Sequence, residues 1–327
     1  MPQIRRLTPP PSARGVGALL LALVLWWSPH AWADEAQAPA NAQPFSVQLG
    51  LGHESSTSPF LSLSDDGQFL TRNGNVRNAG VYRRGVLSGM GDVALGEALL
   101  GWSLHLDHKQ FPTSPSLDFS AAMGHLTLGV PVGAGVTVGT SLSQQNLRVA
   151  GALFRNTRTW SVNTSLGQPD GGVWVADLGF SKHRHPDTYV DMDARVVSTS
   201  VHRRQPVSVW GVQALDINVG YDREHNERGL TDLSQRRVYA RIAAERKTGP
   251  WTWTLGFMVA RTRFDDSALP GMAPRQDRLT SWDLGLAWDL GGGQTLALDL
   301  ASATSLANSK VFDNRYRNAM LSWSVGW

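Results

Sequence analysis

The residues of this chain that could do chemistry are nine histidines and many serines, and there is no cysteine. Without thiols the chain can form neither disulfides nor thiolate metal sites. A serine nucleophile needs a neighbouring base and a third group that orients this base. The sequence has no Gly-x-Ser-x-Gly elbow and no local grouping that points to a triad. We therefore expect no enzyme activity, no catalytic residue and no cofactor.

The strongest local candidate for a metal site is the set His183, His185 and His202, which a hairpin could bring together, because neutral imidazole suits zinc or copper. Four cations crowd these histidines in the sequence, at Lys182, Arg184, Arg203 and Arg204. A cation-rich loop suits contact with lipopolysaccharide phosphate, and a plain solvated loop is the simplest alternative. We expect no metal ligand here.

The elements that must position these side chains are strands, because apolar and polar residues alternate in segments of roughly ten residues from Phe45 onward. Such alternation is typical of a strand with one face on lipid and the other on a wet lumen. Hydrophobic residues make up 42% of the chain, yet mean hydropathy is −0.21. The pattern predicts an all-β fold, a transmembrane antiparallel outer-membrane β-barrel of about 14 strands. Their centres are expected near residues 49, 82, 102, 123, 140, 161, 178, 197, 217, 240, 256, 285, 298 and 322.

The connections between these strands are expected to alternate between long and short. The long ones cover 54–75, 108–116, 145–156, 183–193, 223–234, 262–277 and 302–315, and short ones include 88–92, 131–134, 247–250 and 291–293. Short periplasmic turns and long outer loops are the barrel arrangement. With an even number of strands, both ends of the barrel chain lie on the periplasmic side.

One face of the strands carries polar residues that are expected to line the lumen. These positions are His105, Asp107, Asp177, Asp216, Asn218, Asp222, Tyr239, Arg241, Glu245, Asp283 and Asp299. Charges of both signs fit either a transverse field in an open pore or internal salt bridges in a closed one. A barrel of this size lies between small filled barrels and wide porins, so both alternatives stay open.

The N-terminus reads as an export signal. Arg5, Arg6 and Arg14 precede an apolar core that is too short to span a membrane, and Ala31 and Ala33 form a cleavage site before Asp34. We therefore predict a signal peptide over 1–33, a flexible periplasmic leader over 34–44 and the barrel over 45–327.

The charge balance argues against a nucleic-acid partner. The whole chain has 30 Lys and Arg against 27 Asp and Glu, and the segment 1–33 holds three arginines and no acid. The mature chain is therefore neutral, and the basic isoelectric point belongs to the signal. No nucleic-acid footprint remains.

The last strand carries the pattern by which outer-membrane barrels are recognised for assembly. Leu321, Trp323, Val325 and Trp327 alternate with polar or small residues, and the chain stops on an aromatic residue. The expected partners are therefore the barrel-assembly machinery, outer-membrane lipid and lipopolysaccharide, with the cell outer membrane as the location.

Three stretches resemble the C-terminal barrel of the surface lipoprotein assembly modifier (Slam) family. They are Gly220-Tyr221-Asp222-Arg223, the run 275–279, and the segment 308–327 with Phe312-Asp313-Asn314-Arg315 followed by Arg317-Asn318. Asn314 stands where the family has a second aromatic residue. The resemblance implies translocation of surface lipoproteins or secreted proteins across the outer membrane, with such a protein as a partner.

Family members also carry an N-terminal periplasmic domain of tetratricopeptide repeats, whereas only the leader 34–44 precedes the first strand here. A translocator of this kind would need a separate periplasmic partner. The alternatives are a small-solute or oligosaccharide porin and a structural or adhesive surface barrel.

The signal sequence makes a direct prediction. The mature protein should begin at Asp34 and partition into the outer membrane. N-terminal sequencing of protein from the membrane fraction checks this, and recovery of intact Met1 or of inner-membrane protein would refute it.

Overall fold

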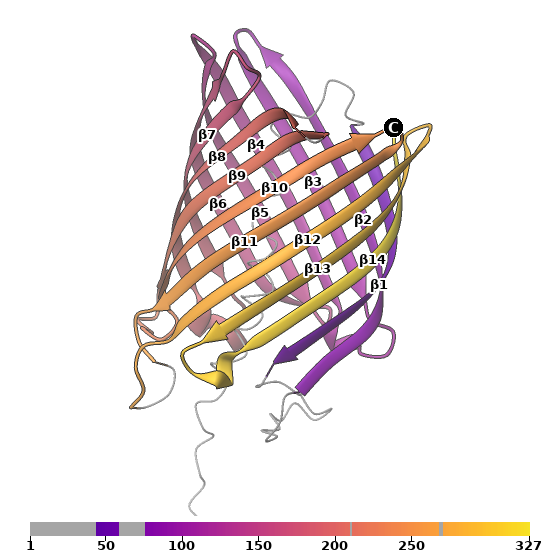
Figure 1. The fold of residues 1–327 in the computed structure, drawn as a ribbon. Helices are drawn as coiled ribbons and strands as arrows, with labels where there is room; N and C mark the ends of the chain where they lie inside the picture. Colours follow the sequence, from indigo (N-terminus) through magenta and orange to yellow (C-terminus); the bar gives the residue numbers. More distant parts are fainter. Residues whose placement is uncertain (1–43, 59–75, 210, 268–270) are drawn as a thin grey trace, which may run out of the picture.

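The computed structural model describes residues 44–58, 76–209, 211–267 and 271–327, which form one closed antiparallel β-barrel (Figure 1). The predicted all-β barrel of about 14 strands is confirmed. The strands are β1 (Phe45–Ser58), β2 (Val76–Leu95), β3 (Ala98–Gln110), β4 (Phe119–Gly133), β5 (Val136–Val149), β6 (Ala152–Gly167), β7 (Val173–Arg184), β8 (Ala194–Val209), β9 (Val212–Asn226), β10 (Gln235–Thr248), β11 (Trp251–Phe264), β12 (Gln276–Gly291), β13 (Gln294–Ala307) and β14 (Asn314–Gly326). The predicted signal peptide, its cleavage site and the leader up to residue 43 lie outside the described residues.

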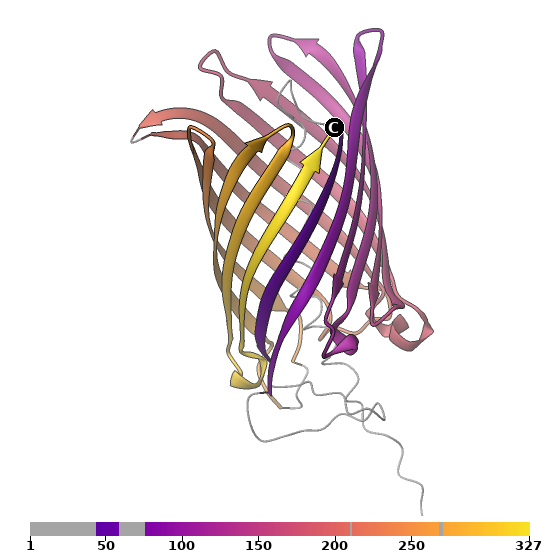
Figure 2. The same ribbon diagram turned by 90° about the vertical axis from the view of Figure 1, so that its right-hand side faces the viewer.

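Every strand pairs with its neighbours in sequence, and β1 pairs with β14 to close the ring (Figure 2). Leu49 lies opposite Trp323, and Leu51 lies opposite Leu321. Where the two strands meet at the chain end, the Phe45 N–H donates to the Trp327 carbonyl at 3.2 Å, and the Trp327 N–H donates to the Phe45 carbonyl at 3.0 Å. Closure leaves no open sheet edge, which a lipid environment would penalise heavily.

The two ends of the barrel differ in their connections. Turns of a few residues join the strands at the end where the C-terminus lies, which is therefore the periplasmic end (Figure 1). The other end carries most of the longer connections and three short 3-10 helices: η3 (Pro115–Leu117), η4 (Asp187–Met192) and η5 (Lys310–Phe312).

The predicted long loop at 145–156 is wrong. β5 and β6 run through this segment and are joined by Ala150 and Gly151 alone. Both residues have positive φ, 49° and 78°, which is the geometry of the tightest β-hairpins. The polar residues that suggested a loop belong instead to the strands that flank the turn.

The predicted short turn at 88–92 is also wrong, because these residues continue β2 and the turn follows at Gly96. Two glycines in the segment suggested a turn, but they serve a different purpose. A Cβ on Gly91 would lie 2.8 Å from the indole nitrogen of Trp102 on the neighbouring strand. The glycines therefore make room for aromatic rings that lie across the wall, an arrangement that compensates for glycine in a strand.

The outer wall is apolar, which fits a protein surrounded by lipid. Leucine, valine and aromatic side chains stand exposed on alternate positions, as Leu49, Leu142 and Leu255 do at 55%, 57% and 56% exposure. Tryptophans gather towards the periplasmic end, where Trp251 and Trp288 stack with ring centroids 5.3 Å apart. An outward apolar band with aromatic residues at its border is the surface of an outer-membrane barrel, and this chain is one. No helix in the described part of the chain is long and apolar enough to cross a membrane.

The two faces of β12 give a matched test of this geometry. Leu284→Arg should destabilise the barrel by roughly 2–4 kcal/mol if it lies near the bilayer midplane, whereas Asp283→Asn on the inward face should leave folding nearly intact. Denaturant unfolding of the protein in lipid vesicles measures both variants. Equal losses of unfolding free energy would contradict the assignment of the faces.

Candidate functional site

The inner wall of the barrel is the surface on which polar side chains gather. The structure places all the residues expected in the lumen at inward positions of β3, β7, β9, β10, β12 and β13. They are His105, Asp107, Asp177, Asp216, Asn218, Asp222, Tyr239, Arg241, Glu245, Asp283 and Asp299. Asp107, Asn218 and Tyr239 are buried, at 4%, 8% and 3% exposure.

Ion pairs between strands organise this wall. The Arg241 guanidinium lies 3.3 Å from the Asp283 carboxylate, although their strands are separated by β11. Asp216 accepts a hydrogen bond from His202 at 3.2 Å. The guanidinium of Arg204, the next inward residue after His202 on β8, lies 3.9 Å from the Asp216 carboxylate and 3.6 Å from the Glu245 carboxylate. Several of the expected lumen residues are therefore tied into networks that run around the circumference.

Sequence reasoning missed part of this wall. Arg84 on β2 donates to the buried carboxylate of Asp107 at 3.0 Å, and Lys109 forms an ion pair with Glu54 at 2.5 Å. Arg155, Glu224 and Arg237 are also buried on the inward side. The alternation that revealed the other lumen residues applies to these positions too. It was obscured in β2 because two consecutive arginines, 83 and 84, occupy opposite faces.

Carboxylates outnumber cations on the inner wall. Between the two rims of the described strands, the inward acids are Glu54, Asp107, Asp177, Asp216, Asp222, Glu224, Glu245, Asp283 and Asp299. The inward arginines and lysine between the two rims are Arg84, Lys109, Arg155, Arg204, Arg237 and Arg241. The lumen therefore has a negative charge excess, which attracts cations and repels anions.

The bulky side chain of Tyr239 lies against the inner wall. Its ring lies over Gly220 on the adjacent strand, so closely that a Cβ at position 220 would overlap the phenol. Glycine is the residue that permits such close approach. The glycine in Gly220-Tyr221-Asp222-Arg223, one of the stretches that carry the Slam resemblance, thus has a packing role within β9.

Three extracellular loops share one construction. Each contains a 3-10 helix that is followed by an aspartate. The carboxylate of this aspartate accepts a hydrogen bond from a backbone N–H at the end of the preceding strand or directly after it. The pairs are Phe111 with Asp118, His185 with Asp193, and Ala307 with Asp313, each at 2.7 Å. The backbone N–H of each aspartate also closes the 3-10 turn.

The residue before each aspartate is apolar and packs inward at the extracellular mouth. Met192 joins a buried cluster with Phe154 and Leu147, and Leu117 packs against a cluster that contains Tyr82. Phe312 lies under the Arg275 guanidinium at 4.2 Å. These contacts therefore fix the three loops against side chains at the extracellular rim.

The loop between β7 and β8 carries two perturbed titratable groups. Burial acts to raise the pKa of Asp193, but the His185 N–H and the Arg184 guanidinium outweigh it and hold this pKa below the ordinary value. Burial and the nearby positive charge of Arg155 lower the pKa of His185 to about 4. At neutral pH, therefore, Asp193 is ionised and His185 is neutral.

The three candidate metal-binding histidines do not converge. His183 lies opposite Ala194, near the extracellular end, whereas His202 lies opposite Val175, far down the same strand pair. His202 is engaged with Asp216, and His183 with Thr157 at 3.0 Å. No group of three potential metal ligands occurs in the part of the chain that the structure describes. The register of the β7–β8 hairpin therefore keeps His183 and His202 apart, although the sequence spacing suggested that a hairpin could bring them together.

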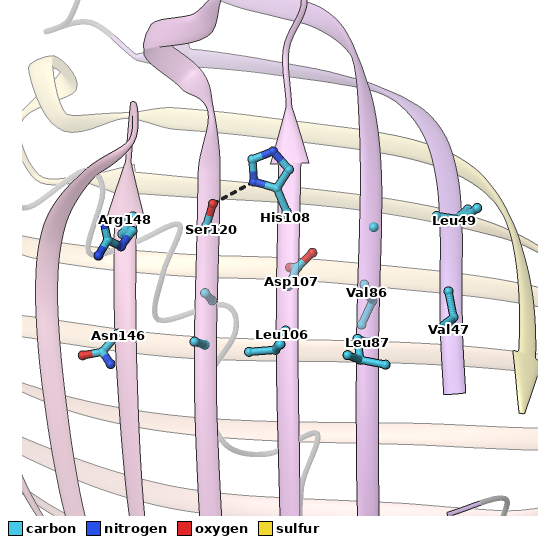
Figure 3. Close-up of a pocket in the computed structure, with 13 residues that line it drawn as sticks. Val47, Leu49, Val86, Leu87, Leu106, Asp107, His108, Ser120, Asn146 and Arg148 are labelled. Atoms are coloured by element: carbon cyan, nitrogen blue, oxygen red, sulfur yellow. Dashed lines mark hydrogen bonds between the residues drawn. The ribbon is translucent and has the colours of Figure 1, made fainter. Parts of the chain in front are cut away.

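The outer wall also has hollows, which do not belong to the lumen. Figure 3 shows one of about 460 Å³ across β1 to β5. His108 and Ser120 are hydrogen-bonded at 2.7 Å at its extracellular side, above Leu49 and Leu106. Because Leu49 and His108 are outward residues, this hollow faces lipid and is not on a path through the barrel.

Several solved structures are similar to this chain. OccK9 (OpdG) of Pseudomonas aeruginosa has 11% sequence identity and a TM-score of 0.44, covering 86% of this chain and 98% of that one. The TodX monoaromatic hydrocarbon channel deltaS2 mutant has 12% identity and a TM-score of 0.46, covering 89% and 91%. The anion-selective porin from Comamonas acidovorans has 8% identity and a TM-score of 0.46, covering 86% and 100%. These values carry no inference about solute or mechanism. No family model and no curated protein matches the chain.

The depressed pKa of His185 predicts that the loop at residues 185–193 becomes less stable at acidic pH. The neutral imidazole of His185 contributes stability to the fold at a pH above about 6.5, its pKa in the unfolded chain. This contribution is lost as pH falls towards about 4, its pKa in the folded protein. Hydrogen–deuterium exchange of residues 185–193, corrected for intrinsic rates, should show less protection at pH 4.5 than at pH 7. His185→Phe should remove most of this difference, and an unchanged pH response in that variant would contradict the assignment.

Proposed function

We propose that this outer-membrane barrel is a channel for small solutes that favours cations over anions. The excess of inward carboxylates is the observation that carries the proposal, because fixed charge on a pore wall concentrates ions of the opposite sign. The polar inner wall and the placement of Tyr239 against the wall also support a water-filled lumen. The inward-packed loops at the extracellular end would set the size of the solute.

Protein translocation, which the Slam resemblance implies, stays a prediction. Residues of the stretches that carry the resemblance have structural roles in this barrel. Arg275 stacks on Phe264 at 4.6 Å and on Phe312 at 4.2 Å, and its guanidinium pairs with Asp277 at 2.6 Å. Asp313 accepts the Ala307 N–H. These contacts stabilise the extracellular mouth and give no separate reason to favour translocation over diffusion.

The selectivity of the pore tests the proposal. Purified protein in a planar bilayer should conduct steadily by itself, and its reversal potential in a salt gradient should show preference for potassium over chloride. Neutralising inward acids in Asp177→Asn and Asp299→Asn should shift the reversal potential towards zero, because each removes fixed negative charge. Arg204→Gln, which leaves Asp216 and Glu245 without this cation, should shift it in the opposite direction.

Two results would contradict the proposal. Anion preference in the unmodified protein would show that the charge excess does not govern permeation. Absence of steady conductance in correctly folded protein, confirmed by heat-modifiable migration, would favour a barrel that opens only with a partner, as a translocator would.

A further inference from the structure

Three cations stand side by side on the outer wall at the extracellular ends of adjacent strands. The strand register places Arg158 on β6 directly opposite Lys182 on β7, and Lys182 directly opposite Arg195 on β8. All three side chains point outward and are exposed; Lys182 and Arg195 have side-chain exposures of 45% and 70%. This row is called the cationic row below.

Like charges directly opposite each other on a sheet are destabilising, so the cationic row calls for a counter-charge. Glu227 supplies part of it, 2.6 Å from Arg195 and 3.9 Å from Lys182. The same carboxylate is shared with Arg184 at 2.6 Å. No described carboxylate forms an ion pair with Arg158. One shared carboxylate cannot balance the row, and a positive excess remains on the outer wall.

An exposed apolar surface adjoins the cationic row on its periplasmic side, further into the lipid-facing part of the outer wall. The next outward residues along the same strands are Trp160, Phe180 and Val197, exposed by 45%, 42% and 41%. The Trp160 and Phe180 rings stack with centroids 5.5 Å apart. Together with Leu142 they line a hollow of about 1050 Å³, and the cationic row forms the extracellular rim of this hollow. The site thus pairs cations at headgroup depth with an aromatic and aliphatic surface at acyl-chain depth.

We propose that this hollow binds lipid A, the diphosphorylated glycolipid that anchors lipopolysaccharide in the outer leaflet. Arginine and lysine at the rim match its phosphate groups, since guanidinium–phosphate pairs are strong, charge-assisted contacts. The exposed aromatic and aliphatic surface matches its acyl chains. The row lies at the end opposite the termini, on the side of the longer loops, which is the leaflet where this glycolipid resides.

Native mass spectrometry of the purified barrel in detergent tests the site with three probes. They are bisphosphorylated lipid A, a dephosphorylated analogue with the same acyl chains, and phosphatidylglycerol. The unmodified protein should retain the bisphosphorylated form in preference to the other two. Arg158→Gln combined with Arg195→Gln should weaken this binding by about tenfold or more, because two phosphate contacts are lost.

A matched control removes the same number of charges from the other end of the same wall. Arg203 and Arg246 are outward cations near the periplasmic turns and lie on non-adjacent strands, β8 and β10. Arg203→Gln combined with Arg246→Gln should leave lipid A binding within about twofold of the unmodified protein. Heat-modifiable migration verifies that each variant is folded.

Three outcomes would overturn the proposal. Retention of the dephosphorylated analogue as tightly as bisphosphorylated lipid A would show that the cationic row makes no contribution. Equal retention of phosphatidylglycerol would show a general anionic-lipid surface. An equal loss of binding in the two double variants would show that net charge alone controls it. The first two comparisons use only the unmodified protein, so they do not depend on how the variants fold.

Discussion

The constraint on which this structure depends is that no backbone donor or acceptor can be left unpaired in lipid. Each unsatisfied group there costs several kcal/mol, so the sheet must close on itself. The pairing of β1 with β14 meets this requirement, and it extends to the last residue through the reciprocal hydrogen bonds of Phe45 and Trp327. The aromatic end of the chain is thus part of the barrel wall.

Closure also divides the side chains into two environments with different rules. On the inside, charged groups form ion pairs between strands, as Arg241 on β10 does with Asp283 on β12 across the intervening β11. On the outside, charges are confined to the ends of the strands, where the wall leaves the hydrocarbon region. The inner wall therefore carries a negative excess, while the outer wall presents a positive row at the extracellular end.

The extracellular mouth illustrates how a barrel orders its loops without regular secondary structure. A short 3-10 helix reverses the chain, and the aspartate that follows it caps the end of the preceding strand. The apolar residue before the aspartate packs into the mouth. One short unit thus satisfies backbone groups and also anchors the loop at the entrance, and it is used in three loops from distant parts of the sequence.

Much of this architecture was predictable from the sequence because the side chains of a strand alternate between faces with a period of two. Alternation predicted an all-β barrel, the approximate strand number, the lipid-facing leucines and tryptophans, and an inward position for residues such as Asp177 and Tyr239. It failed at 88–92 and 145–156. In both places glycine or polar residues mark close packing or a two-residue turn, and local composition alone does not separate these from longer connections.

The tertiary structure alone decided which side chains meet. Alternation predicts which face of the sheet a side chain occupies. The register of two paired strands, which decides which residues lie opposite each other, depends on the shear of the closed barrel. That register set the pairing of Arg241 with Asp283, kept His183 apart from His202, and aligned Arg158, Lys182 and Arg195 in one row. These contacts join residues on different strands, so no sequence window contains the information that brings them together.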